Sequence, residues 1–486
     1  MGGRIAIIGA GFSGTVVAAN LLRRPPAGVS EILLIERAAD IGRGAAYAVH
    51  AFPYLLNVPA SRLSADSGRP LQFLDFARRS LPDAGPEDFL PRQLYGDYLQ
   101  EFLTEAERAA THGTRLTRVR AEVTTLSHRR QADAIVVELA GREPLTARWV
   151  ILATGTPPAT TPVWASGVRE HPAYRDDPFD LPADLGSAQV VLVIGNGLTM
   201  VDVAYQLTHD GARAPRLVTI SRRGLTPLPQ SEFHGSAVEG GGEFLKRVTT
   251  VRELMSATRA LAREVQAHGG DWREVVTFVR NHAPEIWHRL PEVERRRFVR
   301  HVQSHWDVHR HRLPLRLNAH LDALRLMGRL EVRAGRIERA EPVGPRLQVT
   351  WRNRGTGREE RLIADAVINA TGPDYVLRRS RNPLLRSLWT AGLIRADALE
   401  LGLVTTAEHA CVGRDGSVND RLFYLGPMLR ASHWEATAAA ELRNHAERLT
   451  RHLGEVASRF LHQRSDALQQ PFDVAGAAVQ GNARPQ

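Results

Sequence analysis

The sequence contains almost no cysteine and almost no lysine. Cys411 is the single cysteine among 486 residues, which excludes an intrachain disulfide, a cysteine-based metal cluster and a dithiol redox centre. Any redox chemistry must therefore come from a bound cofactor. Lys246 is the single lysine, so nearly all of the positive charge is carried by arginine.

Long apolar runs are also missing. No stretch of about 18 apolar residues occurs, which predicts that no segment spans a membrane. The chain enters a strand pattern almost at once, without a charged start and a signal-type apolar run, so a cytoplasmic location is expected. The formal net charge of +10 comes without a nucleic-acid-binding motif, so no nucleic-acid partner is predicted. The excess of arginine is either a compositional preference or, at a few sites, a means of binding an anionic ligand.

The chain does contain a strand, a glycine turn and a helix near its start, in IAIIGAGFSGTVVAANLL (5–22). Its GxGxxG pattern supplies one glycine for a tight turn, one for the approach of a pyrophosphate, and one for close packing of helix on strand. The pyrophosphate then lies at the helix N-terminus, where free N–H groups favour negative charge. Glu36, at the end of the next strand, is placed to accept hydrogen bonds from ribose hydroxyls. The cofactor-binding residues predicted here are Gly9, Gly11, Ser13, Gly14, Glu36 and Arg37.

A second copy of this device, VVLVIGNGLTMVDVAYQL, occupies residues 190–207. Glu36 follows Gly9 by 27 residues, and the same spacing from Gly195 leads to Arg222. A carboxylate repels a 2′-phosphate, whereas an arginine binds one, so the first turn is predicted to bind FAD and the second NADPH. The alternative is that the arginines are solvated loop residues. The residues predicted for the second site are Gly195, Gly197, Thr199, Arg222 and Arg223.

The second turn departs from the first at its third position. Met200 stands where the first turn has Gly14. Because a side chain at that position should hold the helix farther from the strand, we expect the local geometry of the second turn to differ.

The spacing of the patterns predicts an α/β protein with two Rossmann-like dinucleotide-binding domains, for FAD and NADPH, and a helical insertion. Residues 1–160 are assigned to the first part of the FAD domain and 365–465 to its second part. Between them, residues 161–364 form the NADPH domain, with a helical insert at about 240–330. Residues 466–486, rich in glutamine, alanine and glycine, are expected to be a flexible tail.

Three further stretches resemble a large family of bacterial FAD/NAD(P)-binding proteins, related to the flavin-containing and N-hydroxylating monooxygenases. They are GRGAAYAVHAFPYLLNVPASRLS (42–64), RRRFVRHVQSHWDVHRHRLP (295–314) and FYLGPMLRASHWEATAAAELRNHA (423–446). The strand ends ILATG and INATG, the first closing at Gly155, are part of the same resemblance. Disulfide reductases, which share the two-domain plan, carry an aspartate after the late glycine, where this chain has Pro427.

The resemblance implies roles for residues outside the two turns. Val123 would meet the adenine through its backbone, and Gly426 would lie beside the ribityl chain and the flavin ring. The residues that would line the flavin are Tyr47, Leu56, Asn57 and Val58.

A predicted NADPH site beside a predicted FAD site implies hydride transfer to the flavin. Without a dithiol, the reduced flavin is expected to react with O2 and to oxygenate a small substrate through a flavin hydroperoxide. Asn57 is the candidate catalytic residue, because an amide can both donate to and accept from the flavin edge; the alternative is an ordinary turn asparagine. The competing functions are an NADPH-dependent flavin reductase or electron-transfer flavoprotein, and a non-catalytic FAD-binding regulator. The oligomeric state does not follow from the sequence.

The insert contains the stretch HWDVHRH (305–311). A metal site needs converging ligands, and the interleaved arginines repel a cation, so no metal is predicted. The remaining alternatives are a solvated basic helix and a substrate-binding patch made by His309, Arg310 and His311. The second alternative suggests an anionic or amino-acid-like substrate, for which N-hydroxylation fits. In SHWEA (432–436), Ser432 or Glu435 is expected to cap the last helix.

Overall fold

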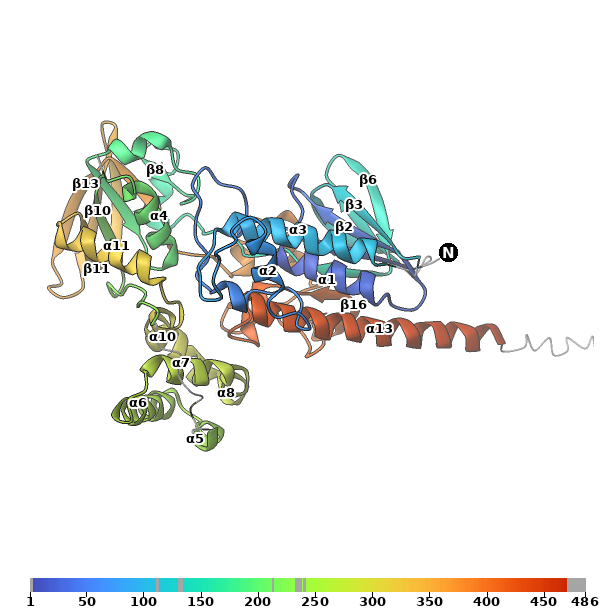
Figure 1. Cartoon of the computed structure of the whole chain (residues 1–486). Coiled ribbons are helices and arrows are strands. Elements are labelled where there is room, and N and C mark those ends of the chain that lie inside the picture. The colour runs from blue at the N-terminus through green and yellow to red at the C-terminus, as the bar shows by residue number, and fades with distance from the viewer. Residues whose placement is uncertain are drawn as a thin grey trace, which may run out of the picture.

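The structure is a computed structural model that describes residues 3–110, 113–129, 134–211, 214–231, 238 and 242–469. Figure 1 shows two sheet domains side by side, with a separate group of helices beneath their junction. A long C-terminal helix runs along the first domain (Figure 1). None of the helices in these ranges combines the length and apolar character needed to cross a bilayer.

The first domain is built on a mostly parallel sheet in the strand order β15-β16-β7-β1-β2-β3. The apolar runs 5–8 and 32–35 are buried on both faces, as expected for central parallel strands. On the sheet lie α1 (Phe12–Arg23), α3 (Arg92–Arg108) and α13 (Ala439–Gln469), with α1 in contact with both others. The strands are β1 (Gly3–Ile8), β2 (Val29–Glu36), β3 (Arg115–Arg120), β7 (Trp149–Leu152), β15 (Ala410–Val412) and β16 (Val418–Tyr424). A small antiparallel sheet is formed by β4 (Val123–Arg129), β5 (Ala134–Leu139) and β6 (Arg142–Ala147).

The second domain has a seven-stranded sheet in the order β13-β12-β11-β10-β9-β14-β8. Helices α4 (Leu198–Thr208) and α11 (Leu315–Leu326) contact each other and cover one face. The parallel strands are β8 (Tyr174–Arg175), β9 (Val190–Ile194), β10 (Arg216–Ser221), β14 (Ala366–Asn369) and the first part of β11 (Leu330–Val343). The end of β11 continues antiparallel into β12 (Arg346–Asn353) and β13 (Glu359–Ala364).

The helical insert has its own apolar core, which also includes Leu401 and Trp434 of the first domain. Two of its helices begin with capping boxes, at Thr250 with Glu253 and at Asp271 with Glu274. Lys246 is exposed and pairs with Glu243 at 2.7 Å. The insert comprises α5 (Gly242–Arg247), α6 (Val251–Ala267), α7 (Trp272–Asn281), α8 (Ala283–Arg289), α9 (Glu292–Arg297), the π-helical turn η5 (Phe298–Val302) and α10 (Gln303–Arg310). The helical segments outside the insert that are not yet named are α2 (Gln72–Arg78), α12 (Pro383–Thr390), η1 (Ala60–Arg62), η3 (Val163–Val168), η4 (Ala183–Ser187), η6 (Leu377–Arg379) and η7 (Pro427–Ala431).

The sheet topology moves several predicted boundaries. β14 belongs to the second sheet, so the return to the first domain comes after Asn369 and not at residue 365. The insert ends earlier than residue 330, because α11 packs on α4 of the second domain. The predicted tail at 466–486 is helical up to Gln469, and residues 470–486 lie outside the described ranges. The last helix begins at Ala439, which removes Ser432 and Glu435 from its cap.

A buried ion pair joins the two sheet domains. Arg92, at the start of α3, donates from Nη2 to Oδ2 of Asp202 on α4 at 2.7 Å. Burial raises the pKa of Asp202, and the charge of Arg92 opposes that rise. Beside this pair the Tyr54 hydroxyl donates to Oε1 of Gln206 at 2.5 Å. Because a buried charge is costly unless it is paired, these contacts hold the two domains in one arrangement.

A cluster of histidines lies where the insert meets the C-terminal part of the first domain. Nε2 of His409 and Nδ1 of His445 are 2.9 Å apart, and the ring centroids of His433 and His445 are 4.5 Å apart. His288 of α8 contacts His433 at a centroid distance of 5.5 Å. Burial, with the nearby histidines and Arg448, lowers the pKa of His409 and of His433 to about 4, and that of His445 to about 2.

This cluster predicts a loss of stability in mild acid. Below a pH of about 6.5 the unfolded histidines take up protons that the folded ones still exclude, so stability falls as the pH drops toward 4. Each such histidine lowers the free energy of unfolding by about 1.4 kcal/mol per pH unit in that window. Denaturant unfolding at pH 7.5, 6.0 and 5.0 measures the slope. We expect His445→Gln to make the slope shallower, and an unchanged slope would contradict the assignment.

Candidate functional site

The first glycine turn connects β1 to α1 and closes against the end of β7. Gly9 has a φ of +103°, and a Cβ there would overlap the carbonyl oxygen of Ala153. A Cβ on Gly14 would overlap the carbonyl oxygen of Gly9. Gly11 is the N-cap of α1, and Ser13 is buried in the first turn of that helix. Two of the three glycines are therefore required by the packing of the turn itself.

Glu36 and Arg37 have different surroundings. The Glu36 carboxylate accepts hydrogen bonds from the N–H groups of Ala10 at 2.7 Å and Ala38 at 3.1 Å. Glu36 therefore stands beside the glycine turn, as its position in the sequence predicts. The Arg37 side chain is mostly exposed, and its guanidinium lies 3.8 Å from the carboxylate of Glu122.

The residues predicted to line a flavin lie between the first turn and α3. Tyr47 packs edge-on against Tyr95 at a centroid distance of 4.7 Å, and burial raises the pKa of Tyr47 to about 12. Leu56 is buried, and its N–H donates to the carbonyl of Leu90 at 2.8 Å. Asn57 and Val58 are half-buried, and the Asn57 amide forms no side-chain hydrogen bond with any described residue. That amide is therefore available to a ligand.

Three further predicted residues occupy strand ends of the first domain. Val123 is buried at the start of β4. Gly155 has a φ of +70° and open space where a Cβ would point. A Cβ on Gly426 would lie 2.7 Å from the Tyr424 hydroxyl, which accepts a hydrogen bond from the N–H of Met428 at 3.1 Å. A larger residue at Gly426 would therefore require the buried Tyr424 hydroxyl to shift.

The second glycine turn has almost the same backbone as the first. Gly195 has a φ of +116°, and a Cβ there would overlap the carbonyl oxygen of Ala370. The N-cap residues match closely, with φ −74° and ψ −158° at Gly11 and φ −80° and ψ −165° at Gly197. No atom lies within 4 Å of the position that a Cβ on Gly197 would take. This open space is where a phosphate group would approach the backbone.

Met200 changes only the first turn of α4. Its side chain is fully buried in the core beneath that helix. In the first copy the Thr15 N–H donates to the Gly11 carbonyl at 3.0 Å, and the equivalent bond from Val201 to Gly197 is longer at 3.4 Å. The Gly197 carbonyl also accepts from the Met200 N–H at 3.1 Å. The expected difference in geometry is thus seen in the hydrogen bonds of the first turn of α4, and the approach to Gly197 stays open.

A cavity of about 1320 Å³ lies between the second turn and the insert. The predicted residues Gly195, Gly197, Thr199, Arg222, Arg223 and His311 all line it. Arg222 is exposed, and its guanidinium forms no ion pair within the described residues. Arg223 donates from Nη2 to the carbonyl of His301 at 2.9 Å, and its Nη1 lies 3.2 Å from Nε2 of His305. Arg222 is thus free to bind a ligand, while Arg223 ties β10 to the insert.

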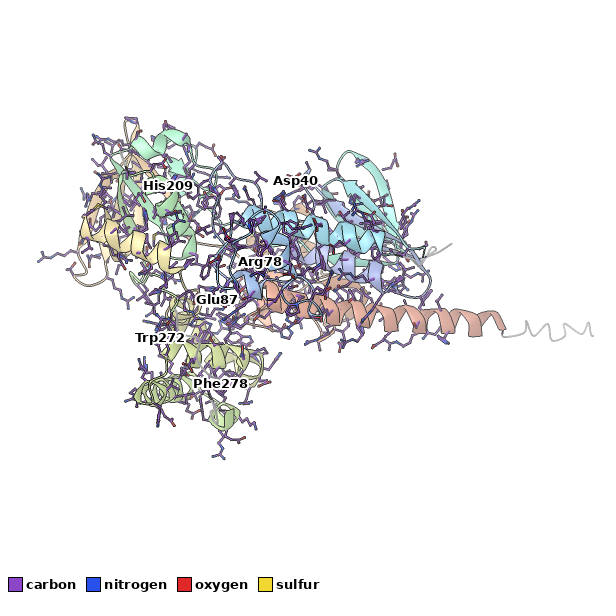
Figure 2. All side chains as sticks on the ribbon, viewed as in Figure 1. Asp40, Arg78, Glu87, His209, Trp272 and Phe278 are labelled. Carbon is purple, nitrogen blue, oxygen red and sulfur yellow. The ribbon has the colours of Figure 1, made fainter. Side chains whose placement is uncertain are left out.

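Of the three residues predicted to bind substrate, only His311 lines this cavity. Arg310 instead donates from Nε to the buried carboxylate of Glu435 at 2.6 Å. His309 packs against Trp272, labelled in Figure 2, at a centroid distance of 5.1 Å. Its Nδ1 donates to the carbonyl of His305 at 2.7 Å. In the described residues, no group of three or more His, Cys, Asp or Glu side chains is arranged to hold a metal ion.

Sequence reasoning missed two carboxylates near this cavity. Glu435, expected to cap the last helix, also accepts a hydrogen bond from Nε1 of Trp306 at 3.2 Å. Asp307 lines the cavity from α10. Both residues lie inside the stretches that carry the family resemblance. That resemblance is the signal in the sequence that could have identified them. Nothing in their spacing indicates which of them is exposed to the cavity.

A family model described as FAD-NAD(P)-binding matches residues 6–157, which contain the first glycine turn and Glu36. The comparison with curated proteins gives no match.

Several solved structures have a similar fold over nearly the whole chain. L-lysine 6-monooxygenase from Pseudomonas syringae is similar with a TM-score of 0.63 at 18% identity, covering 94% of this chain and 100% of that one. The FAD-bound cadaverine monooxygenase of desferrioxamine biosynthesis from Erwinia amylovora has a TM-score of 0.62 at 15% identity, over 93% and 94%. An ornithine N-hydroxylase from Kutzneria, with reduced FAD, NADP+ and L-ornithine, has a TM-score of 0.59 at 14% identity, over 94% and 100%. This likeness confirms the predicted fold class of two Rossmann-like domains.

Proposed function

We propose that the chain is an NADPH-dependent FAD monooxygenase that transfers one oxygen atom from O2 to the nitrogen of a small, amino-acid-like amine. The observation that carries the proposal is the cavity shared by the second glycine turn, Arg222 and helix α10. One of its walls suits a phosphorylated dinucleotide, and the opposite wall carries polar side chains that suit a small substrate. The fold shared with the lysine, cadaverine and ornithine monooxygenases supports the same function.

The residues of the first turn fit FAD. The first N–H groups of α1 have no partner within the helix, and Gly11 places them at the turn where a pyrophosphate would lie. Glu36 stands beside the turn with a carboxylate that can accept from ribose hydroxyls. Asn57 offers a half-buried amide for the edge of the flavin ring.

The residues of the second turn fit NADPH. The space over Gly197 is open, and Thr199 in the first turn of α4 faces the cavity. Arg222 follows the end of β10, where the ribose that carries the 2′-phosphate is held in this type of domain. Its guanidinium can bind that phosphate through two parallel hydrogen bonds.

Together the two cofactors would supply a hydride and, with O2, the oxygen atom that is transferred. The chain itself binds and orients the reactants and excludes water. The thiol of Cys411 is fully buried, and burial raises its pKa, so it takes no part in exchange chemistry.

The proposal is tested by mixing the FAD-loaded protein with NADPH and then with O2 in a stopped-flow instrument. Ethylamine, cadaverine, L-ornithine and L-lysine serve as the first set of amines. We expect rapid reduction of the flavin by NADPH, and an N-oxygenated product whose amount matches the NADPH consumed. The product mass shows the gain of one oxygen atom, and fragmentation of the product ion locates the oxygenated atom.

The same experiment separates the competing functions. Fast reduction with no product from any amine, and with electrons passed to an added acceptor, would favour a reductase. No reduction of the flavin by NADPH would favour a regulator.

Replacing Arg222 with glutamate is expected to raise the KM for NADPH roughly 100-fold, because a bound phosphate would meet a like charge in place of its partner. The KM for NADH should change far less, because that cofactor lacks the 2′-phosphate. Arg108→Glu, at an exposed position at the end of α3, is the matched control for net charge. Equal losses for both cofactors would exclude Arg222 as the phosphate ligand.

A further inference from the structure

Asp307 is a half-buried carboxylate that forms no ion pair with an arginine or lysine of the described residues. It lies on α10 and lines the cavity across from the second glycine turn. Its neighbours are the Gln303 amide, which donates to Oδ2 at 3.3 Å, and the His311 ring, whose Nε2 is 4.0 Å from Oδ1. A half-buried carboxylate that lines a cavity without an ion pair is open to a positively charged ligand.

His311 does not supply that charge. Nη1 of Arg310 lies 3.3 Å from Nδ1 of His311, and since a guanidinium can only donate, Nδ1 is the acceptor. The ring proton is therefore on Nε2, facing Asp307, and the imidazole is neutral. Burial, together with the charges of Arg310, Arg430 and Arg280, holds the pKa of His311 well below its usual value.

The charged groups around Asp307 come from two other segments. Arg430, on η7, has its guanidinium 3.8 Å from the ring centroid of Trp434, and Glu435 follows in the next turn. Partial burial has the largest effect on the pKa of Asp307 and raises it, as Glu435 does to a smaller extent. Arg430, the Gln303 amide and Arg310 lower the pKa, and the net direction is upward. Asp307 is thus a better proton acceptor than a carboxylate in water.

The helix that carries Asp307 is irregular just before the cavity. The π-helical turn η5 lies between α9 and α10, and such turns are frequent at functional sites. After this turn, one face of α10 is directed at the cavity. The lining residues of this segment are Val299, Gln303, Ser304, Asp307, Val308 and His311.

The cavity is also larger than one ligand needs. Small-molecule pockets typically measure roughly 300–1,000 Å³. The volume of about 1320 Å³ leaves room for a second molecule beside a dinucleotide bound at Gly197 and Arg222. The α10 wall is one of the parts of the cavity that lie outside the dinucleotide-binding turn, and residues of η3 and β11 form another.

We propose that Asp307 binds the positively charged amine of the substrate and accepts one of its protons. An N–H bond of the ammonium breaks, an O–H bond forms on the carboxylate, and the freed electron pair stays on the nitrogen. This lone pair is what an N-oxygenation requires, because an ammonium nitrogen has no electrons to share with oxygen. The inference rests on the proposed function.

The test measures amine binding by calorimetry on the FAD-loaded protein at pH 8. Ethylamine, cadaverine, L-ornithine and L-lysine are the probes, with ethanol and 1,5-pentanediol as uncharged counterparts. We expect at least one amine to bind and neither alcohol to do so. Asp307→Asn should weaken that binding roughly 10-fold or more, because it removes the charged hydrogen-bond partner of the ammonium group. Asp322→Asn, an exposed aspartate of α11 paired with Arg325, is the matched control and should bind like the wild type.

Repeating the titrations in two buffers of different ionisation enthalpy counts the protons released. In the wild-type protein the ammonium proton moves to Asp307, so no proton should enter the buffer. In Asp307→Asn the amine can bind only in its neutral form and should release about one proton per molecule bound. If Asp307→Asn loses FAD, Asp307→Ser provides the same comparison.

Three results would overturn the proposal: no binding of any amine, equal binding by Asp307→Asn, or equal proton release by both proteins. None of these readouts depends on turnover. Amine binding that needs Asp307, without an oxygenated product, would refute the monooxygenase function and leave the amine site standing. An oxygenated product with unchanged amine binding in Asp307→Asn would refute the role of Asp307 alone.

Discussion

A Gly14→Ala variant is expected to be purified without FAD. The added Cβ would overlap the carbonyl oxygen of Gly9, which is backbone and cannot rotate away. Helix α1 must then move from β1, and its N-terminal N–H groups leave the place where they would meet a pyrophosphate. Absorbance at 450 nm relative to 280 nm measures the FAD content. We expect near-complete loss and a lower melting temperature.

The control for this substitution is Gly454→Ala in helix α13. A Cβ on Gly454 meets no atom within 4 Å, so the change should keep FAD and add up to about 1 kcal/mol of stability through helix propensity. A Gly14→Ala protein that carries a full complement of FAD would contradict the assignment of the first turn. Because Met200 is tolerated at the equivalent position of α4, Met200→Ala should leave FAD content unchanged.

An Arg92→Met variant is expected to lose about 3–5 kcal/mol of stability at pH 8, because it leaves Asp202 buried without a partner. The loss should shrink as the pH falls, since the unpaired carboxyl can escape the cost by taking up a proton. Urea unfolding at pH 8 and pH 5 measures both effects.

The double variant Arg92→Met with Asp202→Leu should recover most of the loss, because it removes the buried charge together with its partner. A double variant less stable than Arg92→Met would show that the interface depends on another contact. If Arg92→Met is as stable as the wild type at pH 8, the junction between the domains does not keep the Asp202 carboxylate away from water.

Both glycine turns were predictable because each is encoded in a short, continuous stretch. The strand, the turn and the helix follow one another within 18 residues, and the second strand ends at nearly the same distance from the first glycine, at Glu36 in one copy and at Ser221 in the other. Arg222, which the spacing singled out as a phosphate ligand, lines the cavity. The helical character of the insert is equally local, because its capping boxes and apolar periodicity lie within single helices.

The contacts that join distant segments were not predictable. Arg92 and Asp202 are 110 residues apart, and Arg310 and Glu435 are 125 apart, so no periodicity relates them. The strand at 366–369 is apolar and fits either sheet, which is why the domain boundary was placed too early. In the HWDVHRH stretch the charged residues were visible, but the π-helical turn before it decides which of them faces the cavity.

The scarcity of lysine gives the chain a natural attachment point. Lys246 carries the only side-chain amine and is exposed on α5 of the insert, whereas the thiol of Cys411 is buried. An amine-reactive fluorophore will therefore label the insert at one place, apart from the amino terminus, without any engineered cysteine. FAD itself absorbs where a blue dye emits, so energy transfer from that dye would report the distance between the insert and the flavin while the protein turns over.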